Sequence, residues 1–195
     1  MDPSSREHLL RDFQCIVKEA GVTTVFVTHH RAEAFALADR VGIMADGRML
    51  QLGARDDVFL RPASQTVAQI VGVENCLPGR VEASDGASSV VTIGTATIRV
   101  PGQFSCGTKV TVFVRAEEVR LVSAGCRVPD NSLILGKVIN VSLEVSCRRV
   151  TLDCGDFSLV AEVKRRCDLT FALGSEVAAS FHRGAVHVIP GEKDS

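Results

Sequence analysis

The sequence predicts an α/β segment followed by an all-β domain that is built from two repeated lobes. Helical and strand-like patterns alternate through roughly the first seventy residues, and short β-rich stretches replace them from about Asn75 onward. The β-rich part also repeats its own spacing of glycine and valine. We therefore expect domains at residues 1–73 and 74–190, with β repeats at about 75–123 and 131–190.

Apolar periodicity and turn residues predict the elements of the α/β segment. Gly21 is a plausible helix stop, Asp46-Gly47 is a strong hairpin turn, and Pro62 breaks a helical pattern. The run VTTVFVT, residues 22–28, is β-branched and apolar, which is typical of a strand covered on both faces. In chain order we expect a helix over 4–21, a strand over 22–28, a short helix over 31–39, hairpin strands over 40–45 and 48–53, and two short helices within 54–72.

The second part consists of short β-rich stretches separated by Gly, Ser, Asp and Pro, which predicts a small barrel or sandwich. The stretches lie at 90–94, 97–100, 109–114, 119–122, 137–143, 148–153, 158–163, 176–181 and 185–189. Gly79-Arg80-Val81 matches Gly136-Lys137-Val138, and Gly107 and Val110 keep the spacing of Gly174 and Val177. Two such copies would pack into one body or two neighbouring lobes.

Composition disfavours several classes of protein. The net charge is −1 and the chain has no Trp or Tyr, so nucleic-acid binding has neither a basic surface nor many stacking platforms. The seven cysteines form no C-x-x-C pair, which argues against a zinc site and a disulfide framework and favours reduced thiols. No signal peptide or long apolar run is apparent, so we expect a cytoplasmic chain without bound metal.

His29 follows the expected strand at 22–28. In open α/β sheets, ligands bind beyond the carboxyl ends of the strands, where an imidazole can contact a phosphate or a water. A structural or merely exposed histidine is the alternative. A metal pair of His29 with His30 is disfavoured, because adjacent side chains diverge.

The stretch TTVFVTHHRAEAFALADRVGIMADGRMLQLG, residues 23–53, resembles the switch-histidine region of ABC-transporter ATP-binding subunits. Residues 53–75 resemble the segment that follows it in importers of the sugar, sulfate and molybdate type. The β-rich part resembles the transport-associated OB-like (TOBE) domain, and residues 136–189 look most like its molybdate and sulfate versions. The resemblance implies an α/β remnant of a nucleotide-binding domain followed by an all-β TOBE domain.

The resemblance also implies roles for particular residues. His29 would contact the γ-phosphate and the attacking water of ATP, with Mg, at a dimer interface of the intact subunit. His30 stands where the family commonly has an acid, and we interpret it as structural or exposed. Asp2 resembles the D-loop aspartate. The intact subunit would couple ATP hydrolysis to solute uptake, on the cytoplasmic face of the inner membrane, through permease partners.

The P-loop, the Walker B glutamate and the signature motif are not found in the sequence. We therefore expect this chain alone to bind ATP weakly and to be inactive as an ATPase, whether it is a piece of a longer protein or the product of a shortened reading frame. An apolar strand at 22–28 with an unpaired edge favours a homodimer or another homo-oligomer.

A stand-alone oxyanion-binding or regulatory module, without ATPase activity, is the alternative function. The candidates for holding a tetrahedral anion are the basic cluster Lys164, Arg165 and Arg166 and a second cluster, Arg148 with Arg149. A solvated charged loop is the competing interpretation. Molybdate and sulfate are the solutes that the TOBE resemblance favours, while sugar, polyamine and iron remain open.

Overall fold

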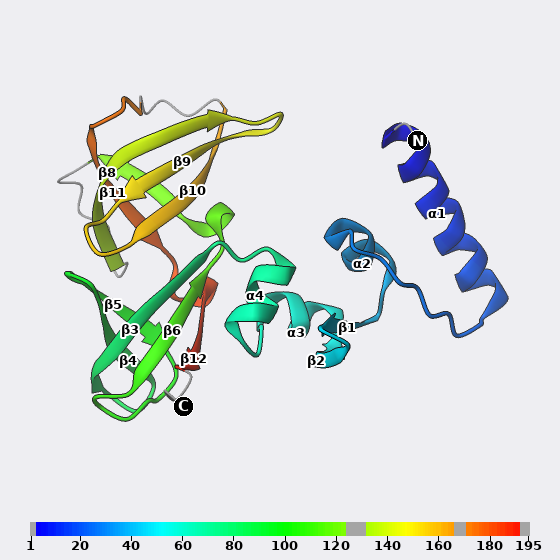
Figure 1. The fold of residues 1–195 in the computed structure, drawn as a ribbon, viewed down its shortest axis with the longest axis horizontal. Helices are drawn as coiled ribbons and strands as arrows, with labels where there is room; N and C mark the ends of the chain where they lie inside the picture. Colours follow the sequence, from blue (N-terminus) through cyan, green and yellow to red (C-terminus); the bar gives the residue numbers. More distant parts are fainter. Residues whose placement is uncertain (1–2, 124–131, 166–170, 192–195) are drawn as a thin grey trace. The chain divides into compact units, whose positions relative to one another are not determined.

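The computed structural model describes residues 3–123, 132–165 and 171–191. By its internal contacts the chain divides into two units, Met1–Ala63 and Ser64–Ser195. The first unit is mostly helical and the second is mostly β (Figure 1). None of the helices among the described residues is long and apolar enough to cross a bilayer.

The first unit follows most of the predicted pattern. The antiparallel hairpin turns at Asp46 and Gly47, whose φ angles of 50° and 72° are those of a type I′ turn. Gly21, at φ 61°, follows the end of the first helix. The elements are α1 (Pro3–Ala20), α2 (Arg31–Leu37), β1 (Arg40–Ala45), β2 (Arg48–Ala54) and α3 (Arg55–Leu60).

The strand predicted at residues 22–28 is wrong. This stretch has no assigned secondary structure and runs as an open segment between α1 and α2 (Figure 1). A strand needs a neighbour for its backbone N–H and C=O groups. Among the described residues no backbone hydrogen bond reaches this stretch, and Val25 and Val27 are 88% and 91% exposed. The β-branched composition is therefore present without the pairing that would make it a strand.

The second unit begins with α4 (Gln65–Val71), which the Ser64 hydroxyl caps by accepting from the Val67 amide at 3.2 Å. Most predicted β stretches are confirmed as strands. The strand β3, with Pro78 and Gly79 inside it, was not predicted. The strands are β3 (Asn75–Ser84), β4 (Ser88–Ile93), β5 (Ala96–Pro101), β6 (Lys109–Val114), β7 (Arg120–Ser123), β8 (Ser132–Leu143), β9 (Cys147–Asp153), β10 (Ser158–Lys164), β11 (Glu176–Phe181) and β12 (Val186–Pro190).

These strands form two five-stranded antiparallel sheets whose last strands are exchanged. One sheet has the order β12-β6-β3-β4-β5 and the other has the order β10-β9-β8-β11-β7. β7 therefore completes the sheet formed by β8 to β11, and β12 completes the sheet formed by β3 to β6. The contacts of β5 with β12 and of β10 with β7 bring the two edges of each sheet together, so each sheet curls toward a closed barrel.

Equivalent positions in the two halves make equivalent hydrogen bonds. The amide of Gly107 donates to the carbonyl of Val81, and the amide of Gly174 donates to the carbonyl of Val138, both at 2.8 Å. The two glycines have φ angles of 81° and 83°, which side chains disfavour. A bulge follows Val81 in β3 and Val138 in β8. The two halves of the second unit are therefore structural repeats of one β arrangement.

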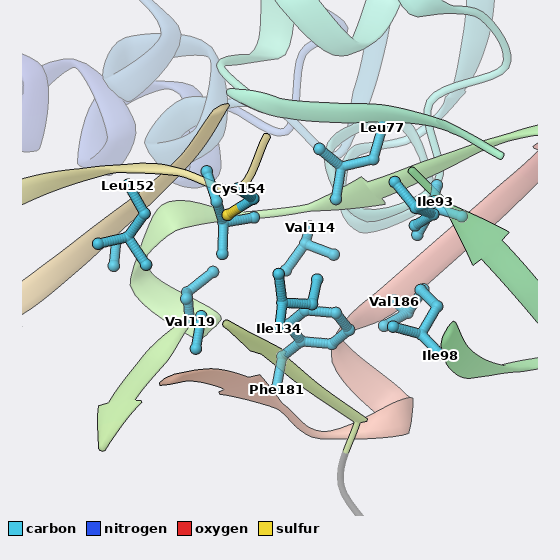
Figure 2. Packing of buried hydrophobic residues seen from close by; sticks show 14 of the residues in the cluster. Leu77, Ile93, Ile98, Val114, Val119, Ile134, Leu152, Cys154, Phe181 and Val186 are labelled. Carbon is cyan, nitrogen blue, oxygen red and sulfur yellow. The ribbon is translucent and has the colours of Figure 1, made fainter. Parts of the chain in front are cut away.

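One hydrophobic core spans both sheets (Figure 2). Figure 2 shows Val114 and Ile98 from the first half near Ile134 and Phe181 from the second half, and all four are nearly inaccessible to solvent. Burying such side chains is the main stabilising term of a small β domain. The exchanged strands therefore place the two halves around shared apolar packing.

A buried amide also joins the halves. The Asn75 side chain, at the start of β3, donates to the Val160 carbonyl at 2.9 Å and accepts from the Val160 amide at 2.7 Å. Val160 lies in β10, an edge strand of the other sheet. Asn75 thus pairs with that edge as a strand backbone would, and it occupies two groups that an edge normally leaves open.

Candidate functional site

His29 lies in the turn that leads into α2. The Thr28 hydroxyl donates to the Glu33 carboxylate at 2.5 Å and accepts from the His30 amide at 3.0 Å. The His30 carbonyl accepts from the amides of Glu33 and Ala34. Glu33 is buried at 6% exposure, so its carboxylate anchors the turn from below the surface.

This turn presents one histidine to solvent and holds the other. His29 is exposed, whereas His30 is half-buried and stands at the N-cap of α2 without a side-chain capping bond. The two rings lie 4.0 Å apart at an angle of 43°. An exposed imidazole on a short anchored turn is placed to contact a ligand that approaches from outside this unit.

An apolar groove of about 540 Å³ lies beside this turn in the first unit. Phe13 of α1 and Phe26 of the open segment line it, with their ring centroids 6.0 Å apart. Asp12 and Glu33 supply carboxylates to a lining that is otherwise made of Leu9, Leu10 and Ile16. The groove is therefore lined mainly by apolar side chains, with two acidic residues among them.

The predicted basic cluster lies where the β8–β9 hairpin meets the end of β10. Arg148 donates to the Arg165 carbonyl at 2.6 Å, and Arg165 donates to the Val145 carbonyl at 3.2 Å. Lys164 is paired in register with Cys147, and its side chain is exposed, as is that of Arg165. The structure therefore brings Arg165 and Arg148 together, and their hydrogen bonds to backbone carbonyls hold the hairpin. Lys164, in register with Cys147, lies on the strand face opposite to that of Arg148.

Arg149, which the sequence grouped with Arg148 as a basic cluster, is instead paired within an acidic network that the sequence did not indicate. It forms ion pairs with Glu74, with Glu144 at 3.5 Å and with Glu162 at 3.2 Å. The carboxylates come from three separate stretches of chain, so only the folded register brings them together. Three carboxylates surround a single guanidinium here, so the network carries a net negative charge.

Cys147 adjoins the same network. Its sulfur, a carboxylate oxygen of Glu144 and one of Glu162 lie within 4.8 Å of one another, a spacing that a metal ion could bridge. Desolvation, followed by the charges of Glu162 and Glu144, raises the pKa of the Cys147 thiol. The guanidinium of Arg149 already provides these carboxylates with a cation.

Two predicted site residues, Asp2 and Arg166, lie outside the described residues. The roles of His29, Lys164, Arg165 and Arg148 stay predictions, now with known surroundings. Composition could not reveal the Asn75 bridge or the Arg149 network, because each depends on residues far apart in the chain.

The fold of the second unit defines a class: paired OB-like β lobes with exchanged last strands. A solved structure of the cytoplasmic molybdate-binding protein ModG, in a form with molybdate bound, resembles this chain with a TM-score of 0.55. The similarity covers 60% of this chain and 95% of that chain, at 19% sequence identity.

No protein-family model matches the chain. Comparison with individual proteins finds relatives that align with nearly its whole length. The chain is 32% identical over 192 residues to the molybdate/tungstate import ATP-binding protein WtpC of Pyrococcus horikoshii, covering 97% of this chain and 54% of that protein. It is 31% identical over 186 residues to the spermidine/putrescine import ATP-binding protein PotA of Ruegeria pomeroyi, covering 93% of this chain and 49% of that protein.

The chain belongs to the family of ABC-importer ATP-binding subunits, as its sequence resemblance predicted. It spans about half the length of the curated relatives that it matches.

Proposed function

We propose that this chain acts as part of the ATP-binding subunit of an ABC importer, and that its paired β lobes form a regulatory module that senses an oxyanion. The paired β lobes are the observation that carries the proposal, since a molybdate-binding protein resembles 60% of this chain over 95% of its own length. The relative from Pyrococcus horikoshii is named for molybdate and tungstate.

Exposed basic residues in the second unit support an anion, in place of the polyamines named for other relatives. Arg165 is exposed and contacts Arg148, and Lys164 beside it in the chain is also exposed. Guanidinium groups bind tetrahedral oxyanions through paired N–H donors, whereas a polyamine requires carboxylates. The acidic network around Arg149 is the place where a polyamine would bind instead.

Isothermal titration calorimetry of the 195-residue chain with molybdate, tungstate, sulfate and spermidine tests the sensing role. We expect heat with molybdate or tungstate, and a weaker response when Lys164 and Arg165 are both changed to Ala. A Lys109→Ala variant, with its change in another sheet, is the matched control. Heat with spermidine alone, or with none of the four solutes, would refute oxyanion sensing.

We further propose that His29 contacts the γ-phosphate of ATP, bound with Mg, in the intact importer, where permease subunits hold the protein at the membrane. Its exposure on the turn anchored by Thr28 and Glu33 supports this role. His29→Ala should abolish solute uptake by cells that depend on this gene, whereas His30→Ala should retain most of it. Equal loss in both variants would contradict the assignment.

Self-association is part of the proposal, because the first unit leaves several large apolar side chains exposed. Leu9, Ile16, Val25 and Val27 are each more than half exposed. We expect a dimer mass by light scattering at micromolar concentration. A monomer mass under those conditions would refute self-association and leave the sensing proposal in place.

A further inference from the structure

The two halves of the second unit carry different side chains on equivalent turns. In the first half, between β3 and β4, the Asp85 amide donates to the Ser88 carbonyl at 3.0 Å. In the second half, between β8 and β9, the Glu144 amide donates to the Cys147 carbonyl at the same distance. Glu144 therefore corresponds to Asp85, and Cys147 corresponds to Ser88.

The neighbouring strand adds a third side chain to each turn, and here the sign of the charge differs. Arg99 of β5 and Glu162 of β10 are equivalent, because each is in register with the second residue after Ser88 or Cys147. The Arg99 guanidinium donates to the Asp85 carboxylate and, at 2.9 Å, to the Ser88 hydroxyl. In the first half this position thus supplies a cation to the turn, whereas in the second half it supplies a carboxylate.

The turn of the second half consequently brings together a thiol and two carboxylates. The Cys147 sulfur and one carboxylate oxygen from each of Glu144 and Glu162 lie within 4.8 Å of one another. Zn²⁺ binds cysteine sulfur and carboxylate oxygen, often through three protein ligands and a water. Its ligand atoms lie within about 4.5 Å of one another, so small rotations of the two glutamates would complete the coordination.

We propose that Glu144, Cys147 and Glu162 form a binding site for a thiophilic divalent cation of the Zn²⁺ class, which fastens the β8–β9 turn to β10. The proposal does not depend on oxyanion sensing. The sequence did not indicate this site, because Cys147 has no C-x-x-C partner and Glu162 reaches it only through the register of β9 with β10.

Arg149 leaves donor atoms available for such an ion. It contacts Oε1 of Glu144 at 3.5 Å and Oε1 of Glu162 at 3.2 Å. The other oxygen of Glu144, Oε2, lies 3.7 Å from the Cys147 sulfur instead. Glu144 can therefore keep its ion pair through one oxygen and bind a metal ion through the other.

The charges around the turn also favour a cation. Glu74, paired with Arg149, adds a third carboxylate to the two of the site. These three carboxylates outnumber the nearby cations Arg149 and Lys164, the latter in register with Cys147. Desolvation, followed by the charges of the two site glutamates, raises the pKa of the Cys147 thiol, so at neutral pH a metal ion would displace the thiol proton into the buffer.

Protection of Cys147 from alkylation tests the site. The 195-residue chain is treated with iodoacetamide with and without equimolar Zn²⁺. The tryptic peptides 138–148 and 100–109 each contain one cysteine, and they report Cys147 and the exposed Cys106. We expect Zn²⁺ to slow the labelling of Cys147 by about tenfold or more, because the bound thiolate is no longer a free nucleophile, and to leave Cys106 unchanged.

Two variants separate a built site from a single reactive thiol. Glu144→Gln combined with Glu162→Gln keeps the thiol and should weaken Zn²⁺ binding by about tenfold or more in calorimetry. Glu82→Gln, at an exposed position of β3, is the matched control. Cys147→Ser should abolish the release of about one proton per bound ion, measured in buffers of different ionisation enthalpy. Serine suits this turn, because Ser88 occupies the equivalent position, and circular dichroism can verify the fold.

The results that would overturn the proposal are specific. Equal labelling of Cys147 with and without Zn²⁺ would mean that Arg149 satisfies the carboxylates and no ion binds. Protection that persists in the double glutamine variant, or that extends equally to Cys106, would mean adventitious binding to thiols. None of these outcomes bears on the oxyanion titrations, which are carried out without zinc.

Discussion

Removing the Asn75 side chain should destabilise the second unit far more than its small size suggests. Asn75 is 2% exposed, and its amide makes two hydrogen bonds with the Val160 backbone, at 2.7 and 2.9 Å. Asn75→Ala breaks both bonds and leaves the Val160 amide and carbonyl without their partner.

The magnitude follows from these two bonds. Each is worth about 1 kcal/mol net, and an orphaned buried group costs a further 1–3 kcal/mol or so. Val160 is only partly buried, so water can re-solvate part of its backbone. We therefore expect the free energy of unfolding to fall by roughly 2–3 kcal/mol. Asn75→Asp should cost at least as much, because it sets a carboxylate oxygen against the Val160 carbonyl.

The assay is urea unfolding followed by far-ultraviolet circular dichroism, since the chain has no Trp or Tyr to report by fluorescence. Asn140→Ala is the matched control, because Asn140 lies exposed on β8. Its effect should stay within about 0.5 kcal/mol. If Asn75→Ala were no more destabilising than Asn140→Ala, the amide bridge would not contribute to the stability of this unit.

Further predictions concern pH and reactivity. The Ser88 backbone amide, followed by the Ser88 hydroxyl and other donors, lowers the pKa of Asp85 from 3.8 to about 2. The stability from this lowered pKa is present above pH 3.8 and is lost as pH falls through about 2. When the midpoint of urea unfolding is measured at a series of pH values, Asp85→Asn should therefore show a smaller decrease at acid pH than the wild type. Burial raises the pKa of the Cys154 thiol to about 11, so iodoacetamide at pH 8 should label the exposed Cys106 and spare Cys154, as peptide mapping would show.

The sequence predicted local elements well where the pattern depends on neighbours in the chain. The hairpin at Asp46-Gly47 formed because both residues accept positive φ angles. The segment at 22–28 shows the limit, because β-branched composition specifies a tendency and only a paired edge makes a strand. β3 was missed because Pro78 and Gly79 interrupt its pattern, although its register with β6 accommodates both.

The pairing between distant strands could not be predicted from the sequence, because local patterns do not say which strands become neighbours in a sheet. The spacing of Gly107 and Gly174 revealed the repeat, but a repeat is equally compatible with two separate barrels and with exchanged strands. The same holds for the site: a cluster of basic residues is visible in the sequence, whereas the carboxylates around Arg149 come from β10 and two other stretches and meet only in the fold.

Strand exchange also makes the two lobes one cooperative body, and hydrogen exchange can show this. Neither half closes its sheet without a strand from the other, since β7 pairs with β11 and β12 pairs with β6. A Cβ on Gly136 would lie 2.9 Å from the Cys154 sulfur and 3.0 Å from the Leu152 Cβ. Gly136→Ala should therefore cost about 1–3 kcal/mol through a change confined to one sheet.

If the lobes open only together, that variant should lower amide protection in β4 by the same factor as in β9, although β4 lies in the other sheet. Gly79→Ala is the reciprocal variant, since its change lies in the sheet that contains β4 and its Cβ would meet Val91 at 2.6 Å. It too should lower amide protection equally in both sheets. Loss confined to the sheet that carries the substitution would mean that exchanged strands open independently, and the β lobes could not then transmit binding in one to the other through their shared fold.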